Sequence, residues 1–143
     1  MLIAHVLRDK GPAVHTLSAE ASLEQAATQL DERRVGALVV LDAQGAIVGV
    51  VSERDLVREI ARRGGAALSD SIGAVMTRDV FTARMDETVD EGLARMTDRR
   101  VRHLPVVEAG KLVGIVSIGD LVKHRIAAVE AEAAAMQAYI AAQ

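Results

Sequence analysis

The sequence predicts an α/β (α+β) fold: two copies of one unit with the order β-α-β-β-α, followed by a C-terminal helix. Residues 48–57 (VGVVSERDLV) return as residues 113–122 (VGIVSIGDLV), and helix-start signals and apolar runs recur in the same order in both copies. Each copy is too short to bury a good core by itself. We therefore expect the copies to pack as a pseudo-two-fold pair, with residues 1–66 forming copy one, residues 67–126 copy two and residues 127–143 a helical extension.

Each copy is expected to open with a short extended segment, residues 13–16 or 80–82, followed by a helix. Ser22 and Thr88 precede these helices, and a Gln or Glu stands three residues after each of them. This spacing is a capping box, in which the hydroxyl and the N3 side chain each accept a hydrogen bond from the other residue's backbone N–H. Apolar residues then recur at helical spacing, so both segments are predicted to be amphipathic helices.

A pair of strands and a second helix complete each copy. The runs 37–41 and 104–107 are apolar throughout, which is typical of strands buried on both faces. Turn-like residues separate each run from a second one, so a hairpin is expected. The predicted partner strands and following helices are residues 47–51 with Glu53–Arg63 in copy one, and residues 112–116 with a helix from Ile118 in copy two.

The alanine-rich tail from Ile126 is predicted to be helical from its propensity. Its apolar stripe alternates at spacings of three and four, as in a heptad repeat: Ile126, Val129, Ala133, Met136 and Ile140. The stripe is short and rich in Ala for a coiled coil. Docking of this helix on its own domain or on a sister subunit is the favoured interpretation, and a coiled coil is the alternative.

The composition bounds the function. Half of the 143 residues are hydrophobic but only 1% are aromatic, which predicts an aliphatic core and argues against base stacking with nucleic acid. The net charge of -3 gives no reason to expect nucleic acid or an anionic membrane as a partner. Cysteine is absent, so disulfides and thiol catalysis are excluded. Without a signal-peptide pattern or an apolar run of membrane-spanning length, a cytoplasmic location is expected.

No catalytic or metal-binding pattern is present. The sequence lacks the Gly-x-Ser-x-Gly elbow, the P-loop and the Gly-x-Gly-x-x-Gly fingerprint. The four histidines share no metal-ligand spacing. We therefore expect no enzyme activity, no metal and no required cofactor.

Ser-x-x-Asp occurs where the second strand of each copy meets its helix, as Ser52 with Asp55 and as Ser117 with Asp120. A helix N-terminus exposes unpaired backbone N–H groups and attracts phosphate. A carboxylate one turn further can accept both hydroxyls of a ribose, as acidic residues do in dinucleotide-binding folds. The same spacing is also a capping box that needs no ligand. On spacing alone the capping box is the simpler interpretation.

The β-α-β-β-α order, closed in each copy by Gly, two aliphatic residues and Ser-x-x-Asp-Leu, resembles the CBS domain, named after cystathionine beta-synthase. The segment 100–107 (RVRHLPVV) is similar to second copies in bacterial stand-alone members of that family. The resemblance covers residues 2–125, and two such copies in tandem form a Bateman module. It implies a cleft between the copies that holds up to two adenosine-type ligands, such as AMP, ADP, ATP, NAD or S-adenosylmethionine.

The resemblance also implies site residues. Asp55 and Asp120 would take the ribose hydroxyls, Ser52 and Ser117 would reach phosphate, and nearby backbone would flank the base. Site 1 then comprises Thr16, Ala37, Leu38, Ser52, Arg54 and Asp55, and site 2 comprises Thr82, Arg102, His103, Leu104, Pro105, Ser117 and Asp120. The sites are expected to be non-equivalent, because each takes its phosphate-binding cation from a different element.

The expected function is non-catalytic regulation. An adenine nucleotide would bind, with AMP favoured and Mg accompanying ATP, and the module would signal in trans to an unidentified effector protein. The resemblance further implies a homodimer formed through helical faces. The alternative is a constitutive dimerisation or scaffold protein with a vestigial nucleotide cleft, and the presence of Ser and Asp in both copies argues against it.

Overall fold

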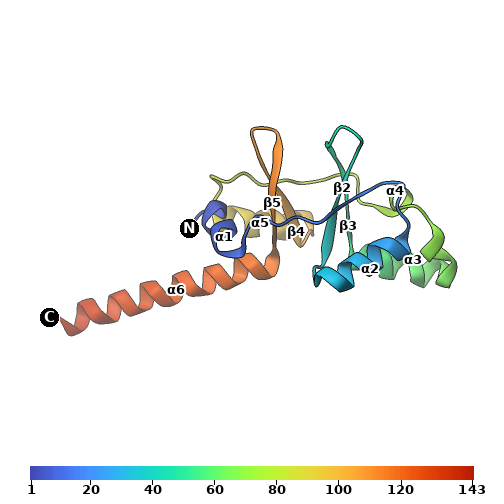
Figure 1. The fold of residues 1–143 in the computed structure, drawn as a ribbon. Coiled ribbons are helices and arrows are strands. Elements are labelled where there is room, and N and C mark those ends of the chain that lie inside the picture. The colour runs from blue at the N-terminus through green and yellow to red at the C-terminus, as the bar shows by residue number, and fades with distance from the viewer. The chain divides into compact units, whose positions relative to one another are not determined.

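The computed structural model describes residues 1–143, which divide into two compact units (Figure 1). The first-repeat unit is Val14–Phe81, and the second-repeat unit combines Met1–Ala13 with Thr82–Gln143. The units therefore do not follow the chain in simple succession, because the N-terminal segment packs with the second repeat.

The first-repeat unit contains a three-stranded sheet. β1 (Thr16–Ser18) pairs in parallel with β2 (Ala37–Leu41), which pairs antiparallel with β3 (Ile47–Ser52). The helices of this unit are α2 (Leu23–Arg33), α3 (Glu53–Arg63), the 3-10 helix η1 (Gly64–Ser69) and α4 (Ile72–Val75). The order predicted for copy one is confirmed. The first strand lies later than residues 13–16, since its pairing starts with Thr16 opposite Val39.

The second-repeat unit has the same order except for its first strand, and its sheet is smaller. β4 (His103–Glu108) and β5 (Lys111–Ser117) form an antiparallel hairpin. The helices are α1 (Ile3–Lys10), α5 (Val89–Arg99) and α6 (Ile118–Ala141). The extended segment predicted at residues 80–82 makes its sheet contact one residue later and as a single bridge. There Ala83 N–H donates to Pro105 O, and Val107 N–H donates to Ala83 O, both at 2.9 Å.

Capping boxes begin α2 and α5, as predicted. Ser22 Oγ accepts from Gln25 N–H at 3.1 Å, and Gln25 Oε1 accepts from Ser22 N–H at 2.8 Å. Thr88 and Glu91 make the same exchange at 3.0 and 3.1 Å. Each box satisfies two backbone donors that the first helical turn leaves unpaired. Local sequence therefore fixes where both helices begin.

Each unit is completed by the linker helix that precedes the other repeat in the sequence. Leu7 of α1 lies over Gly114 of β5, and Met76, just after α4, lies over Gly49 of β3. A Cβ on Gly114 would stand 2.8 Å from Leu7 Cδ1, and a Cβ on Gly49 would stand 2.5 Å from Met76 Sδ. The two glycines leave room for these side chains. This packing explains why the structural units cross the repeat boundaries.

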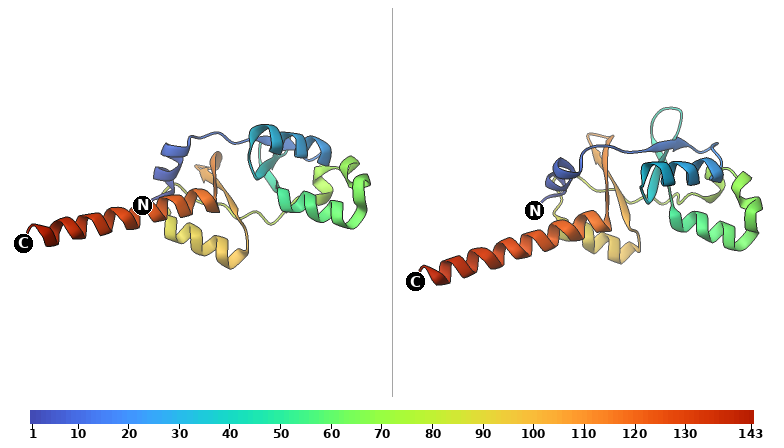
Figure 2. Two further views of the ribbon diagram at one scale, coloured as in Figure 1. Left: turned by 90° about the horizontal axis from the view of Figure 1, so that it is seen from below. Right: turned by 60° about the horizontal axis from the view of Figure 1, so that its bottom comes forward.

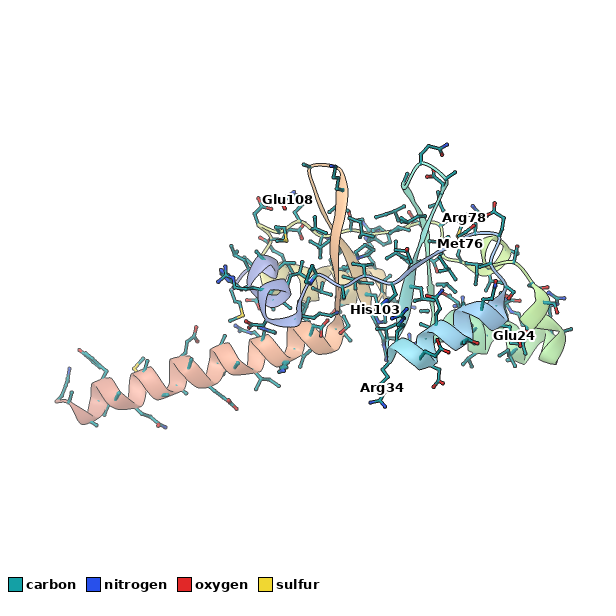
Figure 3. The ribbon with its side chains drawn as sticks, in the orientation of Figure 1. Glu24, Arg34, Met76, Arg78, His103 and Glu108 are labelled. Atoms are coloured by element: carbon teal, nitrogen blue, oxygen red, sulfur yellow. The ribbon has the colours of Figure 1, made fainter.

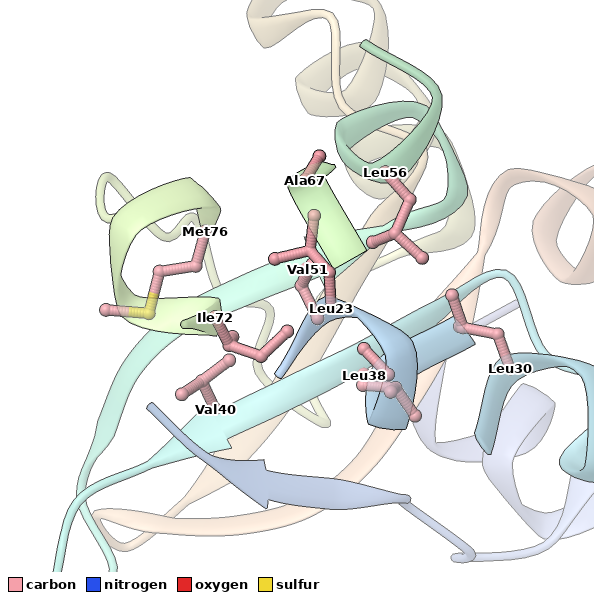
Figure 4. Packing of buried hydrophobic residues seen from close by; sticks show 10 residues of the cluster. Leu23, Leu30, Leu38, Val40, Val51, Leu56, Ala67, Ile72 and Met76 are labelled. Carbon is pink, nitrogen blue, oxygen red and sulfur yellow. The ribbon is translucent and has the colours of Figure 1, made fainter. Parts of the chain in front are cut away.

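The core of the first-repeat unit is aliphatic, as the composition predicts. Helices and strands contribute to one cluster (Figure 4): Leu23, Ala26, Leu30, Leu38, Val40, Val51, Leu56, Ala67, Ile72 and Met76. Complete burial of one larger aliphatic side chain is worth about 1.5–3 kcal/mol. Since Val51 and Leu56 both belong to the cluster, it fixes the junction between β3 and α3 from both sides.

α6 is one continuous helix of 24 residues that includes the predicted tail helix. Leu121, near its start, is buried and packs beside Gly92 of α5. From Val129 onward every residue is exposed. Figure 2 shows this part extending away from the rest of the second-repeat unit. The predicted docking of the tail on its own domain is therefore wrong for this part, and docking on a sister subunit stays a prediction.

Candidate functional site

The first Ser-x-x-Asp sequence lies at the junction of β3 and α3. The strand register places Ser52 opposite Ala37 of β2. Asp55 is buried, with 5% of its surface exposed. Its Oδ2 accepts from Ser52 N–H at 2.9 Å and from Ser52 Oγ–H at 3.1 Å, and its Oδ1 accepts from Arg58 at 2.7 Å. The acid is thus held inside its own helix turn by an ion pair and two hydrogen bonds.

The second Ser-x-x-Asp sequence lies at the junction of β5 and α6, with Ser117 opposite His103 of β4. Asp120 Oδ2 accepts from Ser117 N–H at 2.8 Å and from Lys10 Nζ at 2.6 Å. Lys10 also donates to the carbonyl oxygen of Ile115 at 2.8 Å. The cation that pairs with this acid therefore comes from α1, far away in the sequence.

The two serine hydroxyls both contact the acid of their own repeat, and that of Ser117 also accepts a hydrogen bond from the helix backbone. Ser52 Oγ donates its proton to Asp55, and Ser117 Oγ accepts from Asp120 N–H at 3.1 Å. A hydroxyl has one proton to donate, and in both repeats a side-chain hydrogen bond directs it at the neighbouring acid. Both junctions have the capping-box arrangement, and in each the carboxylate accepts from the serine N–H.

Asp120 is the more accessible acid. Its side chain is 26% exposed, against 6% for Asp55, and its Oδ1 has no hydrogen-bond partner. Partial burial opposes ionisation of Asp120, but hydrogen bonds from Lys10 and Ser117 N–H outweigh burial and lower its pKa below the ordinary value. The carboxylate is therefore ionised at neutral pH and can accept hydroxyl protons.

The remaining residues expected in site 1 lie at one end of the first sheet. Thr16 begins β1, Ala37 begins β2 and Ser52 ends β3, so the strand directions bring all three to the same end. Thr16 and Arg54 are exposed. Leu38 is fully buried in the core. Only its backbone is therefore available to a ligand.

The site 2 residues just before and at the start of β4 follow the same pattern. Arg102 is exposed and His103 is half-buried, whereas Leu104 and Pro105 are buried. Figure 3 places His103 at the end of β4 opposite to Glu108, and the register puts that end beside Ser117. Any contribution of Leu104 and Pro105 to a ligand site comes from the backbone.

Thr82 lies in a polar network that belongs to the second repeat alone. Its carbonyl oxygen accepts from Arg95 at 2.6 Å, and Arg95 pairs at 2.8 Å with Glu87, whose side chain is 5% exposed. Glu87 Oε1 also accepts from Arg84 N–H at 3.2 Å. Burial of a carboxylate requires such partners. The network fixes the backbone of Thr82, the position expected to flank the base.

Sequence reasoning missed two charged partners of the acids. Arg58 stands three residues after Asp55, a spacing that brings side chains together on a helix, so this ion pair could have been predicted. Lys10 could not have been found in this way, because the contact between α1 and the start of α6 is tertiary.

No group of three or more His, Cys, Asp or Glu side chains is arranged to hold a metal ion. No helix has the length and apolar character needed to cross a membrane. The cytoplasmic location stays a prediction.

These observations define a class of protein: a tandem repeat of a small α+β unit with a paired serine and acid at each strand-to-helix junction. The family model of the CBS domain matches residues 10–62 and 72–127, one match for each repeat. The chain therefore belongs to the CBS domain family, and the resemblance inferred from the sequence is confirmed.

Three relatives describe the range of the similarity. The mitochondrial CBS domain-containing protein CBSX3 of Arabidopsis thaliana is 31% identical over 96% of this chain and 71% of its own length. The CBS-domain containing protein ATU1752 from Agrobacterium tumefaciens, known from a crystal structure, is 41% identical in sequence to this chain. The two structures align with a TM-score of 0.84 over 87% of this chain and 92% of that one. The CBS domain pair of protein MJ0100, solved with 5'-methylthioadenosine and S-adenosyl-L-methionine, is 27% identical, with a TM-score of 0.77 over 86% and 94% of the two chains. The chain spans 56 to 71% of the length of the first three curated relatives that it matches.

Proposed function

We propose that the protein is a non-catalytic regulatory module that binds an adenosine-containing ligand at the Ser-x-x-Asp junction of each repeat. One observation carries the proposal: Asp120 is ionised and partly exposed, and it has one oxygen without a partner. The ligands of MJ0100 support it, because both contain adenosine.

The second-repeat site is suited to a nucleoside phosphate. The ribose hydroxyls would donate to Asp120 Oδ1, as charge-assisted hydrogen bonds. Ser117 would turn its hydroxyl from Asp120 to a phosphate oxygen, and the exposed Arg102 would supply positive charge. The base would rest against the backbone near Thr82 and the start of β4. This set of groups favours AMP, with Mg accompanying the additional phosphates if ATP binds.

The first-repeat site is less ready for a ligand. Asp55 is buried and all but one of its acceptor positions are taken. A ligand would have to break the contact with Arg58 or turn the Ser52 hydroxyl. We therefore propose that the second-repeat site binds first and that the first-repeat site binds more weakly.

Signalling in trans completes the proposal. Ligand binding would favour one conformation of the module, by no more than its differential affinity for the two forms, and an effector protein would respond to that form. We also propose that two copies of the chain form a homodimer. A constitutive scaffold that binds no nucleotide is the competing function.

Isothermal titration calorimetry tests the proposal. The nucleotide-stripped full chain is titrated with AMP, ADP, ATP, NAD and S-adenosylmethionine, with GMP and GTP as base controls. Adenine-selective binding is expected, with a tighter and a weaker site. Absence of heat for every adenosine compound, from protein whose circular dichroism shows it to be folded, would leave the scaffold function instead.

A further inference from the structure

The exposed part of α6 carries an apolar stripe that its own unit does not cover. Its members are 40 to 64% exposed and recur at spacings of three and four: Val122, Ile126, Val129, Met136 and Ile140, with Ala133 between Val129 and Met136. Such spacing keeps one seam facing a partner helix for about three heptads. Isolated aliphatic residues on a surface need no explanation, but an uncovered seam of this length does.

The charges beside the seam change sign along the helix. Lys123 and Arg125 flank its first half, and Glu130 and Glu132 flank its second half. In heptad terms, with Ile126 and Val129 at a and d, Lys123 and Glu130 occupy e positions and Arg125 and Glu132 occupy g positions. Only Arg125 has a partner within its own chain, an exposed contact of 3.4 Å with Asp90.

This pattern argues against a lipid surface as the occupant. Membrane-surface helices are rich in Lys and Arg on the polar face, because anionic headgroups attract them. The last eighteen residues of this helix region carry glutamates and no Lys or Arg. A second copy of the same helix meets the requirement better, since it offers both a matching apolar seam and opposite charges.

We propose that α6 pairs with α6 of a second copy in an antiparallel orientation, centred between Ala127 and Ala128. In this register Ile126 faces Val129 of the partner subunit and Val122 faces Ala133 of the partner subunit. Lys123 then lies beside Glu130 of the partner subunit, and Arg125 lies beside Glu132 of the partner subunit. An in-register parallel pair would bring only Arg125 next to a glutamate and leave Lys123 and Glu132 without opposite charges, so the charges select the antiparallel form.

Site-specific cross-linking tests the orientation. Because the chain has no native cysteine, only the introduced cysteines can react. Full-length Val122→Cys and Ala133→Cys proteins are treated with a short bismaleimide, separately and as an equal mixture. The antiparallel pair predicts that the mixed cross-link is the main product and that each protein alone stays largely uncross-linked. In a parallel pair the two positions lie about 16 Å apart along the axis, so each protein would cross-link to itself, and that result would overturn the proposal.

Charge exchange gives an independent test on the full chain. Lys123→Glu with Arg125→Glu makes the flanks negative, and Glu130→Lys with Glu132→Lys makes them positive. Each double variant alone is expected to lose the α6 cross-link introduced through cysteine, and the mixture of the two to regain it. Equal cross-linking in all three samples contradicts the charge argument.

The inference rests on the homodimer part of the proposed function, and sedimentation of the parent chain separates the two. If the parent is a dimer but the mixed cross-link does not form, the homodimer proposal stands and the pairing of α6 is rejected. A monomeric parent at the concentrations used for cross-linking rejects both.

Discussion

Lys10 Nζ lies 2.6 Å from Asp120 Oδ2, so the last residue of α1 neutralises the acid of the second candidate site. The equivalent linker of the first-repeat unit cannot do the same. In that linker, Ile72 corresponds to Ile3 of α1 and Met76 corresponds to Leu7. At the same spacing, the residue that corresponds to Lys10 is an aspartate, Asp79. The cation of the first site is therefore local, and the linker supplies the cation of the second.

Replacement of Lys10 tests what this contact does for stability. Lys10→Met is expected to raise the pKa of Asp120 and to lower the free energy of unfolding at pH 7 by about 0.2–1 kcal/mol, as for other partly exposed ion pairs. Because the folded-state pKa of Asp120 is depressed, its contribution is present above the unfolded-state pKa and is lost as pH falls through the folded-state value.

Urea unfolding of the parent and Lys10→Met at pH 7 and near pH 3 measures this effect. The difference between the two proteins should shrink at the lower pH. Lys111→Met, at an exposed position on β5, is the matched control and should differ little from the parent. A loss that is equal at both pH values would mean that Lys10 acts through packing of its stem and not through the charge of Asp120.

The acids themselves are tested by removal. Asp120→Ala should weaken adenosine-ligand binding at the tighter site by about 1.5–3 kcal/mol, roughly 10- to 150-fold, because a charge-assisted hydrogen bond to ribose is lost. Asp55→Ala should affect the weaker site alone. Calorimetry with AMP compares both with Asp98→Ala, an exposed acid on α5. If both variants bind like the parent, the carboxylates are helix caps and nothing more.

Local signals account for what could be predicted from the sequence. The Ser22 and Thr88 boxes mark the helix starts because a cap involves residues three positions apart. The hairpins follow from apolar runs separated by turn residues. The same local reasoning placed Ser-x-x-Asp at strand-to-helix junctions in both repeats, which is where the structure has them.

Tertiary contacts account for what could not be predicted. Each linker helix packs with the repeat that does not follow it in the sequence. For α1 this depends on the contact of Leu7 with Gly114, more than a hundred residues later, and no local pattern encodes that pairing. The Lys10 contact with Asp120 is a consequence of the same exchange. The strand expected at residues 80–82 reduces to one bridge at Ala83, since the position of a strand is set by its partner's register and not by its own sequence alone.

His124 provides a second pH-dependent contact between α1 and α6. Its Nδ1 lies 2.9 Å from Asp120 O and its Nε2 lies 3.0 Å from Asp9 Oδ2. Both acceptors need a proton from the ring, so these hydrogen bonds, first to Asp120 O and then to Asp9, raise the pKa of His124. The resulting stability is fully present below the unfolded-state pKa and is lost as pH rises through the folded-state pKa.

Asp9→Asn is expected to lower the pKa of His124 towards its ordinary value and to reduce the loss of stability between pH 6 and pH 8.5. The effect is small, about 0.2–1 kcal/mol, because Asp9 is largely exposed. Titration of the His124 ring protons by NMR gives the pKa directly. An unchanged His124 titration in Asp9→Asn would show that the carbonyl of Asp120 alone sets the shift.

The packing of Leu7 over β5 and of Met76 over β3 is tested by adding a methyl group to the glycine that lies beneath each side chain. Gly49→Ala and Gly114→Ala should each destabilise the protein by about 1–3 kcal/mol, since the new methyl group overpacks against Met76 or Leu7. Gly49→Ala should cost more, because its Cβ would also approach Thr77 O to 3.0 Å, and a backbone atom yields less easily than a flexible side chain. Gly65→Ala is the control: nothing lies within 4 Å of its Cβ, so the substitution should be neutral or slightly stabilising through the unfolded state.

Chemical unfolding of the three variants ranks their stabilities. Equal stability of all three would mean that the linker helices are not packed over the glycines in solution, and the contact between Lys10 and Asp120 would then lose its structural basis.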